Sequence, residues 1–232
     1  MLEYELQLEE PLFYFLNGSD SVFWDNFFYL YSYKWTWLLF YFCFLLIFVY
    51  RKNWKEIVCV LLAISLVILL CDQISSGFFK PYFQRFRPTH HPDFQVQVET
   101  VLGYRGGRYG FISSHAANAF GFATFTALIF RNRLFTIMII LFALINGYSR
   151  IYLGVHFISD VVVGSMVGVI AGWVVYELYC YARHKWLKVE KDKLKIPIYS
   201  DKQSYLLCGA YCVMLFGLLI FNNQLISFLI DK

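Results

Sequence analysis

Six long apolar stretches alternate with short polar connections along the chain. A helix that crosses a bilayer needs about 17–25 mostly apolar residues, and fewer where its end is covered by protein. We predict six spanning helices on this basis, at 35–50, 57–79, 116–130, 134–148, 159–181 and 205–230. The pattern therefore predicts an all-α integral membrane protein, folded as a bundle of about six transmembrane helices.

The aromatic segment before the first of these stretches has a different pattern. Residues 11–33 are rich in Phe, Tyr and Trp, but polar residues at 17–20 and Asp25 interrupt them. Such a segment is typical of a helix that lies in the membrane interface. We therefore predict an N-terminal interfacial segment, residues 1–34, and no seventh span.

The composition agrees with a membrane protein of modest size. Hydrophobic residues make up 59% of the 232 residues, whereas a soluble domain usually has about 45–50%. The length predicts a single domain, residues 1–232. The acidic start of the chain does not fit a signal peptide, and the six cysteines show no metal-ligand spacing.

The basic residues divide unevenly between the connections. More than half of the 20 Lys and Arg residues lie at 51–55, 131–133 and 182–202. By the positive-inside rule these connections face the cytoplasm. The N-terminus, segment 80–114, the connection after 148 and the C-terminus then share the outer face. Several cations nevertheless lie on that face, where an anionic ligand would explain them: Lys80, Arg85, Arg87, Arg105, Arg108 and Arg150.

The first polar motif on the outer face is KPYFQRFRP, residues 80–88. Lys80 and Arg87 are seven residues apart, about two helical turns, so they share one side if the segment is helical. Pro88 suits the end of a helix. The pair predicts an anion-binding surface, although a basic collar reaching toward the membrane surface has the same pattern.

The second motif, ISSH at residues 112–115, precedes the third apolar stretch. Ser113 or Ser114 can cap the predicted helix. A helix N-terminus binds phosphate through its free N–H groups and the positive end of its dipole, and His115 lies in that first turn. An ordinary cap beside an interfacial histidine is the alternative.

The third motif is SRIYLGVHFISD, residues 149–160, between the fourth and fifth stretches. Ionisable residues at membrane depth are costly and usually functional. His156 and Asp160 are four apart and would be neighbours on a helix, where the carboxylate fixes the tautomer of the imidazole. Arg150 can bind two phosphate oxygens at once. A buried structural ion pair is the alternative.

All three motifs lie at outer ends of predicted spans, so a bundle would bring them into one pocket. Together they resemble the signature of the type 2 phosphatidic acid phosphatase superfamily, in its bacterial membrane lipid phosphatase branch. In the second motif Ile112 and Ser114 replace the family's usual Pro and Gly. The resemblance covers about residues 80–172, the expected catalytic core. The matching residues are Lys80, Arg87, Pro88, Ser113, His115, Ser149, Arg150, His156 and Asp160.

The resemblance implies a phosphatase that uses no metal and no other cofactor. His156 would attack phosphorus and form a phosphohistidine, with Asp160 orienting it. His115 would protonate the leaving group and then activate water. The expected phosphate-binding residues are Lys80, Arg87, Ser113, Ser114 and Arg150, and Arg85, Arg105 and Arg108 are candidates for headgroup contacts.

Two other classes of function are weaker alternatives. The histidines, with His90 and His91 added, could bind a metal, but the many cations would repel it. A non-catalytic binder or transporter of lipid headgroups would need the cations alone, and not His156, Asp160 and His115.

The position of the site predicts a lipid substrate. The stretches 116–130 and 134–148 would make helices of only about 23 Å, which end below the headgroups and leave a cleft open to lipid. The resemblance favours undecaprenyl diphosphate or a lipid A phosphate, with phosphatidylglycerol phosphate or phosphatidic acid as alternatives. We expect the bilayer and its lipid as partners and no nucleic acid. The expected location is a bacterial inner membrane, with the site facing the periplasm or the exterior.

Overall fold

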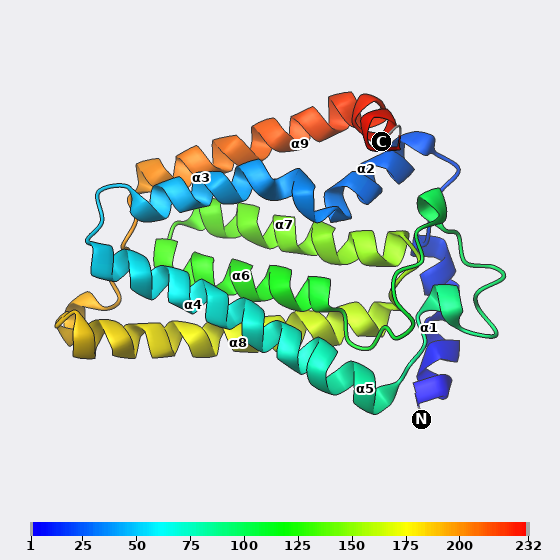
Figure 1. Cartoon of the computed structure of the whole chain (residues 1–232), viewed down its shortest axis with the longest axis horizontal. Helices are drawn as coiled ribbons and strands as arrows, with labels where there is room; N and C mark the ends of the chain where they lie inside the picture. Colours follow the sequence, from blue (N-terminus) through cyan, green and yellow to red (C-terminus); the bar gives the residue numbers. More distant parts are fainter. Residues whose placement is uncertain (1, 231–232) are drawn as a thin grey trace.

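The computed structural model describes residues 2–230, and these residues form helices and connecting loops without a β-strand. Six helices run side by side along the long axis of the molecule (Figure 1). They coincide with the six predicted stretches, which confirms the all-α membrane bundle. Their bounds are α3 Leu38–Val49, α4 Trp54–Asp72, α6 Ser114–Phe130, α7 Arg133–Tyr152, α8 Ile158–Trp186 and α9 Asp201–Ile230.

The length of these helices gives a smaller number of complete spans than predicted. Within residues 2–230, four helices are long and apolar enough to cross a membrane alone: Trp54–Phe83, α7, α8 and α9. A fifth candidate is the pair α2 (Val22–Ser32) and Lys34–Val49, which is bent by 67°. α6 has 17 residues and is about 26 Å long, short of a hydrocarbon core of about 30 Å.

The N-terminal segment is not the single interfacial helix that the sequence predicted. It forms two helices, α1 (Leu2–Leu16) and α2, with a break at 17–21. α1 lies across the end of the bundle (Figure 1). α2 instead packs into the bundle beside α7 and α9, where Leu30 and Tyr31 are almost completely buried. The apolar side chains in the second half of α2 are therefore covered by protein, whereas Val22, Phe23 and Trp24 at its start are exposed.

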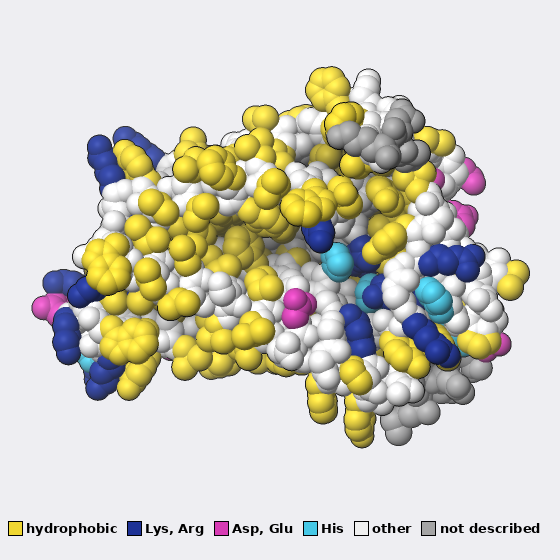
Figure 2. All heavy atoms as spheres, in the orientation of Figure 1, with side chains coloured by type: hydrophobic (Ala, Val, Ile, Leu, Met, Phe, Trp, Pro, Cys, Tyr) yellow, Lys and Arg dark blue, Asp and Glu magenta, His cyan; other side chains and the backbone are white. Residues whose placement is uncertain are grey.

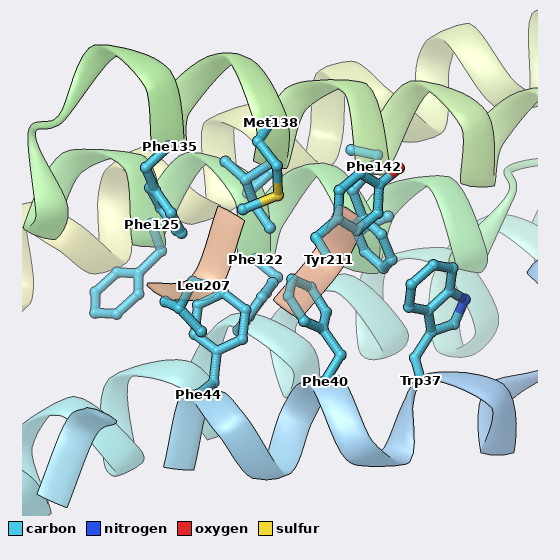
Figure 3. Close-up of a cluster of buried hydrophobic side chains, with 14 of the residues drawn as sticks. Trp37, Phe40, Phe44, Phe122, Phe125, Phe135, Met138, Phe142, Leu207 and Tyr211 are labelled. Atoms are coloured by element: carbon cyan, nitrogen blue, oxygen red, sulfur yellow. The ribbon is translucent and has the colours of Figure 1, made fainter. Parts of the chain in front are cut away.

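Aromatic side chains fill the space between α3, α6, α7 and α9. Figure 3 shows Trp37 and Phe40 pointing toward Phe142 and Tyr211. The Trp37 and Phe142 rings meet edge to face with centroids 5.0 Å apart, a favoured geometry for such pairs. The Tyr211 hydroxyl lies 3.0 Å from that of Tyr31. This core holds the bend between α2 and α3 against the rest of the bundle.

Glycines bring α6 and α8 into close contact. A Cβ added at Gly164 would lie 2.6 Å from the Ser113 carbonyl oxygen, and one at Gly168 would lie 2.3 Å from that of Ala117. Small residues every four positions allow this approach between membrane helices, as the sequence predicted. The contact fixes the start of α6 relative to the start of α8, where the second and third motifs lie.

The two ends of the bundle differ in charge. The connections α3–α4, α6–α7 and α8–α9 share one end, on the left in Figure 1, and basic side chains gather there in Figure 2. The other end holds α1, the loop 84–113 and the end of α9. The predicted division of the connections between two faces is therefore confirmed.

Candidate active site

The first motif occupies the end of a long helix and an extended segment after it. α4 continues through a π-helical stretch, Gln73–Phe79, into α5 (Lys80–Phe83). Gln84 then takes a positive φ of 46° and ends the helix. The following backbone pairs with the loop, since Arg87 N donates to the Arg108 carbonyl at 3.1 Å. A continuous helix from Lys80 to Arg87 is therefore wrong, although both cations reach the same site.

Ser114 links the first motif to the second. Its hydroxyl accepts from Lys80 Nζ at 2.7 Å and from Ser75 Oγ at 2.8 Å, and Ser76 Oγ lies 3.0 Å away. Ser75 and Ser76 belong to the π-helical stretch, a feature that is frequent at functional sites. Ser114 thus holds the ammonium group of Lys80 at the start of α6.

Ser113, one of the two serines predicted as candidates, is the N-cap of α6. Its Oγ accepts from Ala116 N at 3.4 Å, and its own N–H donates to the Asp160 carbonyl oxygen at 3.0 Å. His115 follows in the first turn with an exposed side chain. The N-terminus of α6 therefore meets the start of α8, with His115 open to a ligand.

The third motif begins inside α7, which is longer than predicted. The helix continues to Tyr152 and includes Arg150 in its last turn. It can do so because the polar residues there are bonded locally, as Ser149 Oγ is to the Asn146 carbonyl at 2.6 Å. Gly154 then turns the chain with a φ of +67°, where a Cβ would lie 2.6 Å from Val98. The expected short fourth span is therefore wrong.

His156 and Asp160 make the expected contact through a different local geometry. α8 begins at Ile158, so His156 precedes it. Asp160 Oδ2 lies 3.2 Å from His156 Nδ1 and accepts from Phe157 N at 3.1 Å. The carboxylate thus binds the imidazole and the first turn of its own helix, and both side chains are buried.

Arg87 faces the other nitrogen of this imidazole. Its Nη1 donates to His156 Nε2 at 3.2 Å and to the Val155 carbonyl at 3.1 Å, and its Nε donates to the Tyr109 carbonyl at 3.2 Å. A guanidinium only donates hydrogen bonds, so Nε2 is the acceptor and Nδ1–H points to Asp160. This tautomer leaves the lone pair of Nε2 toward the cations.

The surroundings of His156 favour its neutral form. Burial, followed by the charges of Arg87, Arg150 and Lys80, lowers the pKa of His156 well below 6.5. Burial and the nearby Arg150 lower the pKa of Arg87 to about 10, so Arg87 keeps its charge at neutral pH. The site is a neutral imidazole beside several cations, an arrangement that suits an anion.

Arg150 is held by two residues that sequence reasoning missed. It is 2% exposed and donates to Ser32 Oγ, at the end of α2, and to Tyr104 Oη at 3.2 Å. Its guanidinium also lies over the Tyr104 ring, 5.5 Å from the centroid. No spacing in the sequence connects these three residues, because the bend between α2 and α3 brings Ser32 to the site.

Arg85 does not have the headgroup-facing position that was predicted. It is buried, with Nη1 lying 3.2 Å from Asp160 Oδ1 and Nη2 lying 2.8 Å from Glu9 Oε1. Glu9, on α1, also accepts from Ser159 N at 2.9 Å. Arg85 is therefore wrong as a headgroup contact, because its charge is used between two carboxylates. Glu9 was missed, since its only signal was the acidity of the N-terminus.

Arg105 and Arg108 lie in the loop 84–113 with exposed side chains. Arg108 covers the Phe86 ring, 5.1 Å from its centroid. Their headgroup contacts stay a prediction. Residues 2–230 contain no group of three or more His, Cys, Asp or Glu side chains that could hold a metal ion, so the alternative of a metal site with His90 and His91 has no support among them.

Two cavities adjoin at His115. The larger, about 550 Å³, is apolar and runs between α3, α4 and α6. The smaller, about 270 Å³, is bordered by Arg150 and tyrosines. His115, Ser32 and Lys34 border both. In Figure 2 the His, Lys and Arg side chains lie around a hollow beside the large hydrophobic surface.

Comparison with known protein families identifies the family that has this arrangement. The model of the PAP2 superfamily matches residues 61–184, which include all three motifs. The chain belongs to the PAP2 superfamily. It is a bacterial membrane protein and a lipid phosphatase of that family, as the motif resemblance predicted.

Individual relatives extend the similarity beyond the motif region. The chain is 45% identical over 228 residues to a lipid A 4'-phosphatase of Porphyromonas gingivalis, covering 98% of this chain and 97% of the relative. It is 39% identical over 178 residues to a lipid A 4'-phosphatase of Bacteroides thetaiotaomicron, covering 76% and 79% of the two chains. The crystal structure of Aquifex aeolicus LpxE superposes with a TM-score of 0.56 at 28% identity, covering 73% of this chain and 95% of that one.

Proposed function

We propose that this protein hydrolyses the 4'-phosphate ester of lipid A through a phosphohistidine intermediate. The observation that carries the choice of lipid is the 45% identity, over nearly the whole length of both chains, to a lipid A 4'-phosphatase. The arrangement of His156, Asp160 and the cations supports the chemistry. Undecaprenyl diphosphate, which the sequence favoured equally, has no comparable observation in its support.

The first step is attack by His156 Nε2 on phosphorus. Arg87, Arg150 and Lys80 bind the phosphoryl oxygens, and Arg87 turns its Nη1 from the imidazole to the phosphate. The Nε2–P bond forms while the bond from phosphorus to the sugar oxygen breaks, and the imidazole becomes cationic. Asp160 balances that charge through Nδ1–H. The cations stabilise the negative charge spread over the transferring phosphoryl group.

His115 carries the proton in both steps. The negative charge of the bound phosphate offsets the nearby cations, so His115 can hold a proton in the complex. Its imidazolium gives this proton to the departing sugar oxygen, and the neutral ring then takes one from a water that attacks the phosphohistidine. Inorganic phosphate leaves and His156 regains its neutral form. His115 suits this role because its exposed ring borders both cavities, the space from which a leaving group or water arrives.

The apolar cavity supports a substrate with acyl chains. It begins at His115 and continues past aromatic and aliphatic side chains, among them Phe44, Leu61, Ile64 and Phe122. Such a cavity can take a hydrocarbon chain while the phosphate stays among the cations. α6, which begins at Ser114, lines this space with Asn118, Ala119 and Phe122.

The charge of the two ends supports an orientation in the bilayer. The basic end would face the cytoplasm by the positive-inside rule. The site would then open at the outer leaflet of the bacterial inner membrane, toward the periplasm.

Phosphate release from a panel of purified lipids tests the proposal. The wild-type protein and His156→Ala are compared on lipid A, undecaprenyl diphosphate and phosphatidylglycerol phosphate in the same detergent. We expect the highest kcat/KM on lipid A, with loss of the 4'-phosphate shown by mass spectrometry, and no turnover by His156→Ala. A higher kcat/KM on another lipid would contradict the substrate, and an active His156→Ala would contradict the nucleophile.

A further inference from the structure

The smaller cavity lies on the side of the site where the leaving group must be. In the proposed mechanism His115 protonates the departing oxygen, so the group attached to that oxygen is next to His115. Two cavities border His115 there, and the larger one is lined mainly by aromatic and aliphatic side chains. The other is bordered by Arg150, Lys34, Ser32 and tyrosines, so it offers hydrogen-bonding groups to a polar leaving group.

Three tyrosines give the smaller cavity a lining of aromatic rings and hydroxyl groups. Tyr29 lies in α2, Tyr33 directly follows the end of α2, and Tyr104 lies in the loop 84–113. The rings of Tyr29 and Tyr33 stack with centroids 6.4 Å apart, and Tyr104 meets Tyr29 edge to face at 6.2 Å. All three are only partly exposed, so each presents a ring face or edge and a hydroxyl. Rings with a polar group suit ligands that have both apolar faces and hydroxyl groups.

We propose that this aromatic cavity binds the sugar ring that carries the phosphate, as a subsite for the saccharide part of the substrate. Its volume of about 270 Å³ lies just under the range of about 300–1,000 Å³ that is typical of small-molecule pockets, a size that suits one sugar ring. The stacked tyrosines face the C–H groups of the ring, and Lys34 and the tyrosine hydroxyls bind its oxygens. The proposal rests on the proposed function, because it assumes that His115 serves the leaving group.

The arrangement assigns the two cavities to two parts of one lipid. Lys34 and Ser32 border both cavities beside His115. An acyl chain attached to the phosphorylated sugar can therefore enter the apolar cavity while the ring stays in the aromatic one. A lipid phosphate built on glycerol has no ring to fill the second cavity. The cavity thus selects for a sugar, and its α2 walls lie outside the matched family segment 61–184.

The test compares substrates with and without a sugar. Tyr33→Leu removes one wall of the cavity, Tyr33→Phe keeps the ring without its hydroxyl, and Tyr205→Leu, an exposed tyrosine on α9, is the matched control. Each variant and the wild type are assayed for phosphate release from lipid A and from dodecyl phosphate, which has no sugar. Thermal unfolding of each variant confirms that it folds.

The expected result is a change in selectivity. Tyr33→Leu should lower kcat/KM on lipid A about tenfold more than on dodecyl phosphate, Tyr33→Phe should have a smaller effect, and Tyr205→Leu should leave the ratio of the two unchanged. An equal fall on both substrates, or no fall, would overturn the saccharide subsite. Failure of the proposed function looks different, because the wild type itself would then release no phosphate from lipid A.

Discussion

The buried charged residues behind His156 are positioned by pairing with residues of opposite charge. Asp160 contacts His156 with one oxygen and Arg85 with the other, and Glu9 lies behind Arg85. Buried charges are costly unless they are paired and hydrogen-bonded. Glu9 does not approach the phosphate site, yet it completes the pairing that holds Asp160 behind the nucleophile. We therefore expect Glu9 to be a positioning residue.

Neutralising Glu9 should slow the chemistry more than it weakens substrate binding. In Glu9→Gln the charge of Arg85 is balanced by Asp160 alone, which draws the carboxylate away from His156. We expect kcat to fall about tenfold or more, with KM changed less than about twofold. Steady-state kinetics on lipid A measures both constants.

Two further variants separate positioning from a loss of structure. Glu10→Gln changes the neighbouring glutamate of α1, and we expect wild-type kinetics. Glu9→Gln should add little to Arg85→Gln, because both act through one chain of contacts. The positioning role would be refuted by additive effects, or by a rise in KM with kcat intact.

The low pKa of His156 sets an expectation for acid conditions. Burial and the neighbouring cations lower the pKa of the ring well below 6.5, so the ring is still neutral at pH 6.5. The nucleophilic form is thus retained as the pH falls through 6.5, and it is lost only at the lower folded-state pKa. The measurement is kcat/KM as a function of pH, corrected for ionisation of the substrate phosphate, which is measured in the same micelles. We expect the acid limb of this corrected profile to have its midpoint below pH 6.5. A corrected midpoint at or above 6.5 would contradict a buried neutral His156 in the free enzyme.

The residues that could be predicted are those linked by spacing. Lys80, Arg87, His115, Arg150 and His156 all stand in motifs, and the structure brings them to one end of the bundle. Glu9, Ser32 and Tyr104 could not be found this way. Each reaches its partner through the docking of a distant element, so no short interval in the sequence connects the two.

Individual elements decide how accurately the motifs meet. α6 carries His115 and α8 carries Asp160, and their glycine contact leaves no space for a side chain at Gly168. The position of each helix along the other is therefore fixed by backbone contact. The prediction of small-residue packing needed only the four-residue spacing of the glycines.

Enlarging Gly168 should destabilise the protein and disturb the site. A Cβ there would lie 2.3 Å from the Ala117 carbonyl oxygen, so in Gly168→Leu the two helices must separate. We expect a loss of stability of about 1–3 kcal/mol or more, seen as a lower Tm, together with lower kcat. Gly209→Leu on α9 is the control, since nothing lies within 4 Å of its Cβ position. Equal effects of the two substitutions would argue against this contact.

Helix ends were the part of the elements that hydropathy could not predict. The polar residues after 148 suggested that the fourth span ends there, but they continue α7 because their side chains are bonded within the protein. Lys80 to Arg87 suggested two helical turns, whereas Gln84 ends the helix. Both differences depend on particular hydrogen bonds, such as that of Ser149 Oγ to the Asn146 carbonyl and that of Arg87 N to the Arg108 carbonyl, which the apolar pattern does not encode.

At the scale of the whole molecule, the bundle separates a basic end from the end that holds the site. The apolar stretches were sufficient to predict six helices and the sharing of connections between two faces. They were not sufficient to predict that α2 joins the bundle, because an aromatic segment can bury its apolar side in protein or in the interface.

Reporter fusions test the orientation of these two ends. A reporter that is active only outside the cytoplasm is fused after Ile230, and in a second protein it is inserted at residue 190, in the connection between α8 and α9. We expect activity from the first and none from the second, because the positive-inside rule places the basic connections inside. The reverse pattern would place the site on the cytoplasmic side.

The contact of α1 with the site also has a consequence for biosynthesis. Glu9 is made before its partners Arg85 and Ser159, which follow 76 and 150 residues later in the chain. α1 therefore cannot take its final place until the start of α8 has been made. A nascent chain that stops before Ile158 lacks the surface that receives α1, so the hydrolase becomes competent only once α8 has been made.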